Sequence, residues 1–347
     1  MNMIGTLIFA LLVFSLIIFV HELGHFLTAR LFGVKVHEFA IGMGPQLFAR
    51  QRGETKYSIR AVPMGGFCSM EGEDAASDDS GSFSKKPWYA RFVILAAGAT
   101  MNIILGFLIC TLFVALYYKS VGIPTTTVGK VMDYSPLYDF LEPGDRIISV
   151  DGQRVNIKRD IDFIMQQSDG SECDITVKRG SERLTKTFAP YTAKQNDGSA
   201  AYLIGFTAEI KPMSVFGVLR ESFFQTLWTV KLVFVSLKML LTGGASVADV
   251  SGPVGIVSTM NTAAHQQNGF IALLYLAALI SVNIGVMNLL PFPALDGGRI
   301  FFVLVEAVRR KPIPPEKEGV VHFIGMALLI ALMIVATWND ILRLIGH

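Results

Sequence analysis

Long apolar runs alternate with polar segments along the chain. Residues 92–118, 270–295 and 320–338 contain no Lys, Arg, Asp or Glu, and a further apolar run covers residues 4–29. A helix of about 20 apolar residues crosses the roughly 30 Å hydrocarbon core of a bilayer. The pattern therefore predicts an α-helical polytopic membrane protein with four transmembrane helices.

Residues 216–241 form another apolar segment, but their position is ambiguous. Lys231 and Lys238 are seven residues apart and fall on one face of a helix. Two charged side chains on one face favour a helix that lies in the bilayer interface or packs against the bundle. Entry into the membrane is the alternative.

The polar segment between the first two spans has strand character. Residues 57–62 are rich in β-branched and aromatic side chains, and glycine-rich stretches flank them at 41–45 and 62–67. We expect short β-hairpins over residues 36–70. One alternative is that they associate with the membrane and dip toward its core, where protein or water must cover irregular backbone. The other is an ordinary cytoplasmic hairpin.

The segment between the second and third spans predicts a small β-rich domain. Short strand-like runs lie at 128–131, 146–150, 173–179 and 185–189, with a tight-turn pair at Asp151-Gly152. The resulting domain prediction is residues 1–121 for two spans and the hairpins, 122–208 for the β-rich domain, 209–267 for amphipathic helices, and 268–347 for two further spans and their loop.

Composition and charge agree with a membrane protein. The 347 residues are 52% hydrophobic and 17% charged, and the net charge of +2 does not favour nucleic acid as a partner. Lys and Arg concentrate in residues 30–91 and 309–317. The positive-inside rule makes these segments cytoplasmic, so both termini and residues 122–208 are expected outside.

Ionisable side chains interrupt the first apolar run near its end. His21, Glu22 and His25 form the pattern H-E-x-x-H. On a helix, the two histidines share one face and can bind one zinc ion, and Glu22 can act as general base. The alternative is a helix end at the headgroups, but that does not explain the spacing.

The third span ends in a second candidate site. Asp296 follows an uncharged run that contains Pro291 and Pro293, and Gly297 and Gly298 come next. Catalytic zinc usually has three protein ligands, and Asp296 is the best third candidate, although the motif alone could simply end a span in a turn. If residues 216–241 crossed the bilayer, Asp296 would lie about 30 Å from the histidines.

These motifs resemble the site-2 protease family of intramembrane zinc metalloproteases (M50), in its RseP-type branch. The resemblance rests on His21–His25, on Asn288–Gly298, on Asn102 and on two glycine-rich segments. It implies a zinc ion held by His21, His25 and Asp296, with Glu22 as base. We expect Asn288 to stabilise the tetrahedral oxygen, with Asn283 and Asn102 as weaker candidates that could instead satisfy helix contacts.

The resemblance also implies an external PDZ domain at residues 122–208, where the family's well-known enterobacterial member has two in tandem. A strand edge in the hairpins would hold the substrate. The expected substrate-binding residues are Gly42, Gly44, Gly65, Gly66 and Phe67 in the hairpins, and Leu203, Ile204, Gly205 and Phe206 in the PDZ domain.

The implied function is hydrolysis of single-span membrane proteins, such as anti-sigma factors or remnant signal peptides, in a bacterial inner membrane. A zinc peptidase that trims soluble tails and a PDZ-bearing scaffold are the alternatives. The scaffold is disfavoured because His21, Glu22, His25 and Asp296 are all present.

Overall fold

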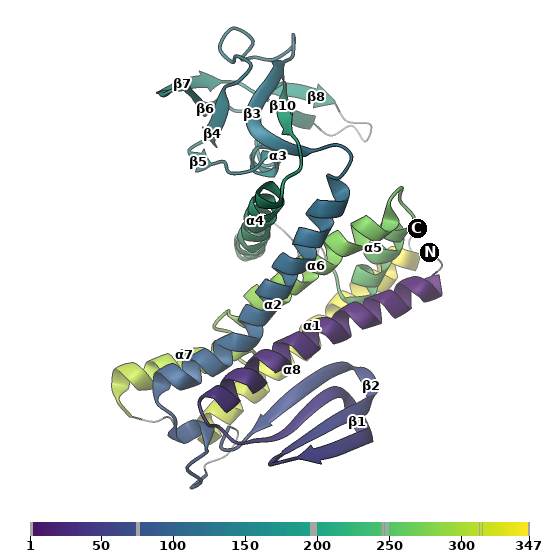
Figure 1. Ribbon diagram of the computed structural model, residues 1–347, viewed down its shortest axis with the longest axis vertical. Helices are drawn as coiled ribbons and strands as arrows, with labels where there is room; N and C mark the ends of the chain where they lie inside the picture. Colours follow the sequence, from purple (N-terminus) through teal and green to yellow (C-terminus); the bar gives the residue numbers. More distant parts are fainter. Residues whose placement is uncertain are drawn as a thin grey trace. The chain divides into compact units, whose positions relative to one another are not determined.

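The computed structural model describes residues 3–73, 77–194, 200–244, 246, 250–311, 313 and 315–345. It forms two compact units, one of Met1–Ile109 with Thr229–His347 and one of Cys110–Trp228 (Figure 1). Helices α2 and α4 each contribute to both. We refer to them as the helical unit and the β-rich unit and describe each by itself.

Long helices dominate the helical unit. They are α1 (Met3–Leu31), α2 (Trp88–Tyr117), α4 (Val215–Leu241), α5 (Pro253–Ala264), α6 (Gly269–Asn288), α7 (Asp296–Arg309) and α8 (Pro315–Ile345). Of the described helices, α1, α2, α4, α6 and α8 are long and apolar enough to cross a membrane. The four predicted spans are among them, and α4 meets the same criterion, which does not distinguish a spanning helix from an interfacial one.

Contacts within the helical unit give the directions of its helices. Ala10 of α1 packs with Leu273 of α6 near the start of both helices, whereas His21 meets Asp296 beyond the end of α6, so α1 and α6 run parallel. Helix α2 is antiparallel to α1, because Ile94 contacts His25 and Asn102 contacts His21.

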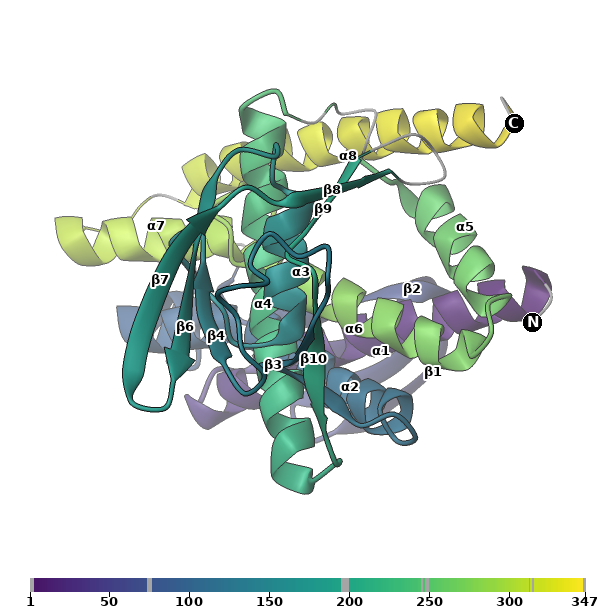
Figure 2. The same cartoon turned by 90° about the horizontal axis from the view of Figure 1, so that it is seen from above.

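Helix α5 lies at the end of the bundle where α1 begins (Figures 1 and 2). Thr6 donates a hydrogen bond to Asn261 of α5 over 3.3 Å. The second half of α4 packs against the same bundle, because Val233 clusters with Val282 and Val286 of α6, next to Ile103 of α2. Of the predicted positions of α4, this contact favours the one against the bundle.

The predicted hairpins are two long, bent strands, β1 (Val36–Arg52) and β2 (Thr55–Met70). Residues 39–41 of β1 pair with residues 66–68 of β2 on one side and with residues 57–59 on the other. The bends fall at Gly42, Gly44 and Gly65, whose φ angles of 86°, 81° and 91° favour glycine. Among the described strands, none pairs with the outer side of residues 66–70, which therefore form a sheet edge.

The β-rich unit contains one main sheet with the order β10-β3-β4-β6-β7. Its elements are β3 (Ile123–Val131), β4 (Arg146–Val150), β5 (Gln153–Arg154), α3 (Lys158–Gln166), β6 (Cys173–Arg179), β7 (Glu182–Phe188), β8 (Tyr191–Lys194), β9 (Ala200–Leu203) and β10 (Phe206–Lys211). The side chains of Ile147, Ile175 and Val177 are fully buried between sheet and helix. The predicted fold class is thus confirmed for its helices, several of which are long and apolar enough to cross a membrane, and for its inserted β-rich domain.

A buried ion pair fixes the loop before β4. Arg179 at the end of β6 donates from Nε and Nη2 to the two carboxylate oxygens of Asp145, each over 2.8 Å. Its Nη2 also donates to the Phe140 carbonyl. These hydrogen bonds and the guanidinium charge hold the pKa of Asp145 below its ordinary value.

We expect this pair to make the β-rich unit sensitive to acid. Because the folded pKa of Asp145 is lowered, its contribution to stability is present above its unfolded pKa of about 3.9 and is lost as the pH falls through the folded value. Amide protection in β4 and β6 should therefore decrease between about pH 5 and about pH 3. Hydrogen exchange of the full-length protein, corrected for the intrinsic effect of pH, measures this. Asp145→Asn should have weaker protection at about pH 5 and a smaller pH dependence, and an unchanged dependence would contradict the assignment.

Candidate metal centre

Three predicted ligands from two separated parts of the chain converge in the helical unit. His21 and His25 lie one turn apart on α1, and Asp296 is the first residue of α7. Asp296 Oδ2 lies 3.1 Å from His21 Nε2 and 3.3 Å from His25 Nε2. The two Nε2 atoms are 3.2 Å apart.

This geometry fits a zinc ion. At bond lengths of about 2.0–2.1 Å, the ligand atoms of tetrahedral zinc lie about 3.3 Å apart, which matches all three distances. Asp296 Oδ2 is buried, and no donor in the described part of the chain bonds to it with hydrogen-bond geometry. A cation among the three atoms would satisfy this oxygen and both imidazole lone pairs at once.

The outer nitrogen of each histidine has a partner that orients the ring. His25 Nδ1 lies 2.9 Å from the Ile94 carbonyl, so Nδ1 carries the proton and Nε2 presents its lone pair to the metal position. His21 Nδ1 lies 3.2 Å from Asn102 Nδ2, while Asn102 Oδ1 is buried without a hydrogen bond. Turning the Asn102 amide by 180° lets Oδ1 accept the His21 Nδ1 proton.

The predicted base, Glu22, lies beside the sheet edge. Its carboxylate accepts a hydrogen bond from the backbone N–H of Cys68 in β2. A Cβ on Gly66 would come within 3.3 Å of Glu22 Cγ, so the edge strand passes directly alongside the base. An extended peptide paired with this edge would therefore run past both Glu22 and the ligands.

The other predicted hairpin residues have different surroundings. Gly42 and Gly44 form the bends of β1, and Gly65 packs against the Met43 side chain. The Phe67 ring lies 4.8 Å from the Arg60 guanidinium. The structure therefore brings Gly66 of this set to the base.

Asn288 is the last residue of α6, half-buried and eight residues before Asp296. Its role in stabilising the oxyanion stays a prediction. Asn102, a weaker candidate for that role, instead contacts His21, one of the predicted zinc ligands.

Two glycines that were not predicted as site residues make room for the centre. A Cβ on Gly98 would lie 2.3 Å from His25 Nε2 and 2.9 Å from His21 Cε1. A Cβ on Gly24 would lie 2.6 Å from the Ala97 carbonyl oxygen. The sequence does contain a signal, because Gly98, Asn102 and Gly106 recur every four residues on α2, a spacing typical of close helix packing in membranes.

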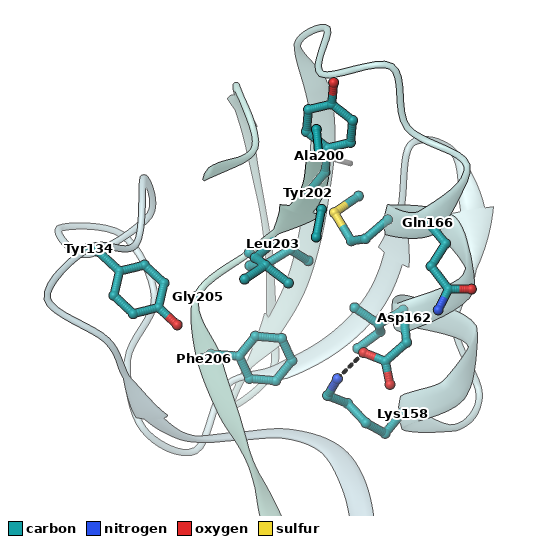
Figure 3. Close-up of a pocket in the computed structure, with 13 residues that line it drawn as sticks. Tyr134, Lys158, Asp162, Gln166, Ala200, Tyr202, Leu203, Gly205 and Phe206 are labelled. Carbon is teal, nitrogen blue, oxygen red and sulfur yellow. Dashed lines mark hydrogen bonds and ion pairs between the residues drawn. The ribbon is translucent and has the colours of Figure 1, made fainter. Parts of the chain in front are cut away.

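The β-rich unit contains a hollow. It is lined by the four residues predicted to bind substrate in the PDZ domain, Leu203, Ile204, Gly205 and Phe206. Figure 3 shows Leu203 and Phe206 between Tyr134 on one side and the Lys158–Asp162 ion pair of α3 on the other. The Lys158 ammonium also lies 5.4 Å from the centre of the Phe206 ring. Since β10 is an edge strand of the main sheet, this hollow can accept an extended peptide.

Comparisons with known proteins match nearly the whole chain. The profile of Peptidase family M50 matches residues 9–332. A Clostridium perfringens protein named as a zinc metalloprotease is 40% identical over 340 residues, covering 97% of this chain and 98% of its own. The regulator of sigma-W protease RasP of Bacillus subtilis is 30% identical over 425 residues, which cover 98% of this chain and 99% of RasP. A solved PDZ domain of an SdrC-like protein from Listeria innocua is 25% identical and covers 25% of this chain and 96% of its own, with a TM-score of 0.22.

We expect Gly98→Ala to weaken zinc binding by about 10- to 100-fold, because its methyl group would displace the His25 and His21 rings. Bound zinc after dialysis against a mild chelator, measured by elemental analysis, tests this. Gly319→Ala is a matched control, since a Cβ there meets nothing within 4 Å. Equal zinc in the two variants would contradict the proposed packing.

Proposed function

Because the chain belongs to Peptidase family M50 and its Clostridium perfringens relative is named as a zinc metalloprotease, we propose that it is an intramembrane endopeptidase. It would cut single-span membrane proteins within or near their membrane spans. The observation that carries the proposal is the meeting of His21, His25 and Asp296 beside Glu22 and an open strand edge. The ligands lie on α1 and just after the end of α6, and both of these helices are long and apolar enough to cross a membrane.

The residues divide the chemistry between them. His21, His25 and Asp296 would hold zinc, which when bound polarises the scissile carbonyl and acidifies water. Glu22 takes a proton from the water that attacks the carbonyl carbon and passes it to the leaving nitrogen as the C–N bond breaks. The Cys68 N–H holds the carboxylate of Glu22 in place for both transfers.

A substrate helix must be unwound before it can be cut, because a helix satisfies its own amides. Apart from the Cys68 N–H, which bonds to Glu22, the outer edge of residues 66–70 has no strand partner in the described part of the chain, and an extended substrate would pair there. Gly66 has no side chain, so the paired substrate can approach Glu22 closely. The edge strand would thus hold the scissile bond at the metal.

We further propose a bacterial inner membrane location, with both termini and the PDZ domain outside. The Lys and Arg bias of residues 30–91 and 309–317 supports this orientation. The Bacillus subtilis relative is named as a regulator of sigma-W protease. By analogy, we propose anti-sigma factors, along with remnant signal peptides, as substrates.

The PDZ domain has two candidate roles. The hollow between Leu203, Phe206 and α3 favours capture of a chain end or strand. Alternatively, the domain excludes substrates with bulky external parts and admits trimmed ones. Neither role requires it to supply a zinc ligand, because all three ligands belong to the helical unit.

We expect Glu22→Gln to retain zinc and to lose proteolysis by several orders of magnitude, because the amide cannot take or return a proton. Zinc content and cleavage of a single-span substrate are measured on the same preparation. Mapping the cut by mass spectrometry separates cleavage inside the span from trimming of a soluble tail. Wild-type turnover by Glu22→Gln would exclude this residue as the base.

Deleting residues 125–205 and joining the ends with a flexible linker separates the two roles of the PDZ domain. If the domain is a filter, the variant should cut short substrates as before and also cut substrates with intact external domains. The measurement is the ratio of long to short substrate cut at equal protein level. An unchanged ratio would reject the filter, and loss of all cleavage with zinc retained would favour delivery of the substrate by the domain.

A further inference from the structure

The segment that carries Asp296 into place is irregular and strained. Residues 289–295 join α6 to α7 and contain Pro291 and Pro293. Ala294 has a φ of 76°, a left-handed conformation that an alanine rarely adopts. Such a conformation persists only where its surroundings hold it, and Asp296 lies just two residues further along.

Helix α8 contacts this segment from a distant part of the sequence. The Ala294 N–H donates a hydrogen bond of 3.0 Å to Nδ1 of His322. Because Nδ1 accepts this bond, it is not available as a metal ligand. His322 therefore contacts the backbone beside the third ligand, and it is not one of the residues that form the group His21, His25 and Asp296.

A glycine on the same face of α8 allows the close approach. A Cβ on Gly325 would lie 2.4 Å from Pro293 Cβ and 2.5 Å from the Pro293 carbonyl carbon and oxygen. Among residues 317–335, all of which the structure describes, only Gly325 is buried. Since His322 and Gly325 are three residues apart, one face of α8 packs on two consecutive residues of the ligand segment.

The hydrogen bond lies in a partly covered part of the helical unit. The His322 side chain is 16% exposed, and its ring centre lies 6.2 Å from that of Phe302 in α7. An amide N–H in such apolar surroundings is costly to leave without an acceptor. Without His322, the turn at Ala294 would relax to satisfy that amide and would shift Asp296.

We propose that His322, seated by Gly325, is a positioning residue for the third metal ligand. It touches neither substrate nor metal and acts by fixing the backbone at Ala294. The proposal rests on the zinc site described above. It assigns α8 a part in forming that site, although α8 supplies no ligand.

The test measures metal binding and does not depend on proteolysis. The full-length protein, without zinc, is titrated with Co²⁺, whose visible spectrum reports both affinity and ligand geometry. We expect His322→Leu to weaken Co²⁺ binding by about 10- to 100-fold and to alter the spectrum. His322→Asn places an amide oxygen near the position of Nδ1 and should recover most of the affinity.

Two controls separate positioning from general damage. His265→Leu removes an exposed histidine of α5 that bonds only to its own helix in the contacts described, and it should bind Co²⁺ as the wild type does. Gly325→Ala should weaken binding, whereas Gly319→Ala on the same helix should not, because a Cβ there meets no atom within 4 Å.

Equal Co²⁺ affinities for wild type and a folded His322→Leu would overturn the proposal. If His322→Leu does not fold, equal affinities for Gly325→Ala and Gly319→Ala would do so. Failure of the wild type itself to bind metal would instead overturn the proposed zinc site. The two failures are therefore distinguishable.

Discussion

Two imidazole nitrogens and a carboxylate oxygen lie within 4.8 Å of one another inside an apolar bundle. Their lone pairs repel one another, so a cation between them is the arrangement that makes the cluster favourable. The neighbouring structure follows from this constraint. Gly98 leaves space for the rings, while Ile94 and Asn102 bind the outer nitrogens. Each of these features belongs to α2, which contributes no ligand.

The two irregular backbone segments near the centre share a physical solution. Backbone that leaves a regular helix at membrane depth must find partners within the protein. The N–H of Cys68 bonds to Glu22, and the N–H of Ala294 bonds to His322. In both cases a side chain from a long helix satisfies the amide, and in both cases the bond also positions a residue of the proposed chemistry. The hydrogen bonds that satisfy these two amides therefore also position residues of the proposed site.

The parts predicted from sequence are those that local spacing determines. The apolar runs predicted the spans, the H-E-x-x-H spacing predicted two ligands, and the break after α6 predicted Asp296. The four-residue spacing of Gly98 and Asn102 indicates a packing face on α2, but their roles, like that of His322, depend on which residues of other helices face them. The double pairing of β1 residues 39–41 likewise depends on strand register. Helix α4 stays ambiguous because length and apolarity are shared by spanning and interfacial helices.

The proposed pairing of substrate with the strand edge at residues 66–70 has a consequence for the range of proteins that this enzyme would process. A binding surface made of backbone amides and carbonyls recognises extended conformation, with little regard to the identity of individual side chains. The discriminating quantity is then the cost of pulling a segment out of its helix. Glycine, proline and β-branched residues lower that cost, because they stabilise a helix less well than alanine or leucine. Such an enzyme would select transmembrane segments by how easily their helices unwind, and a consensus sequence would matter little.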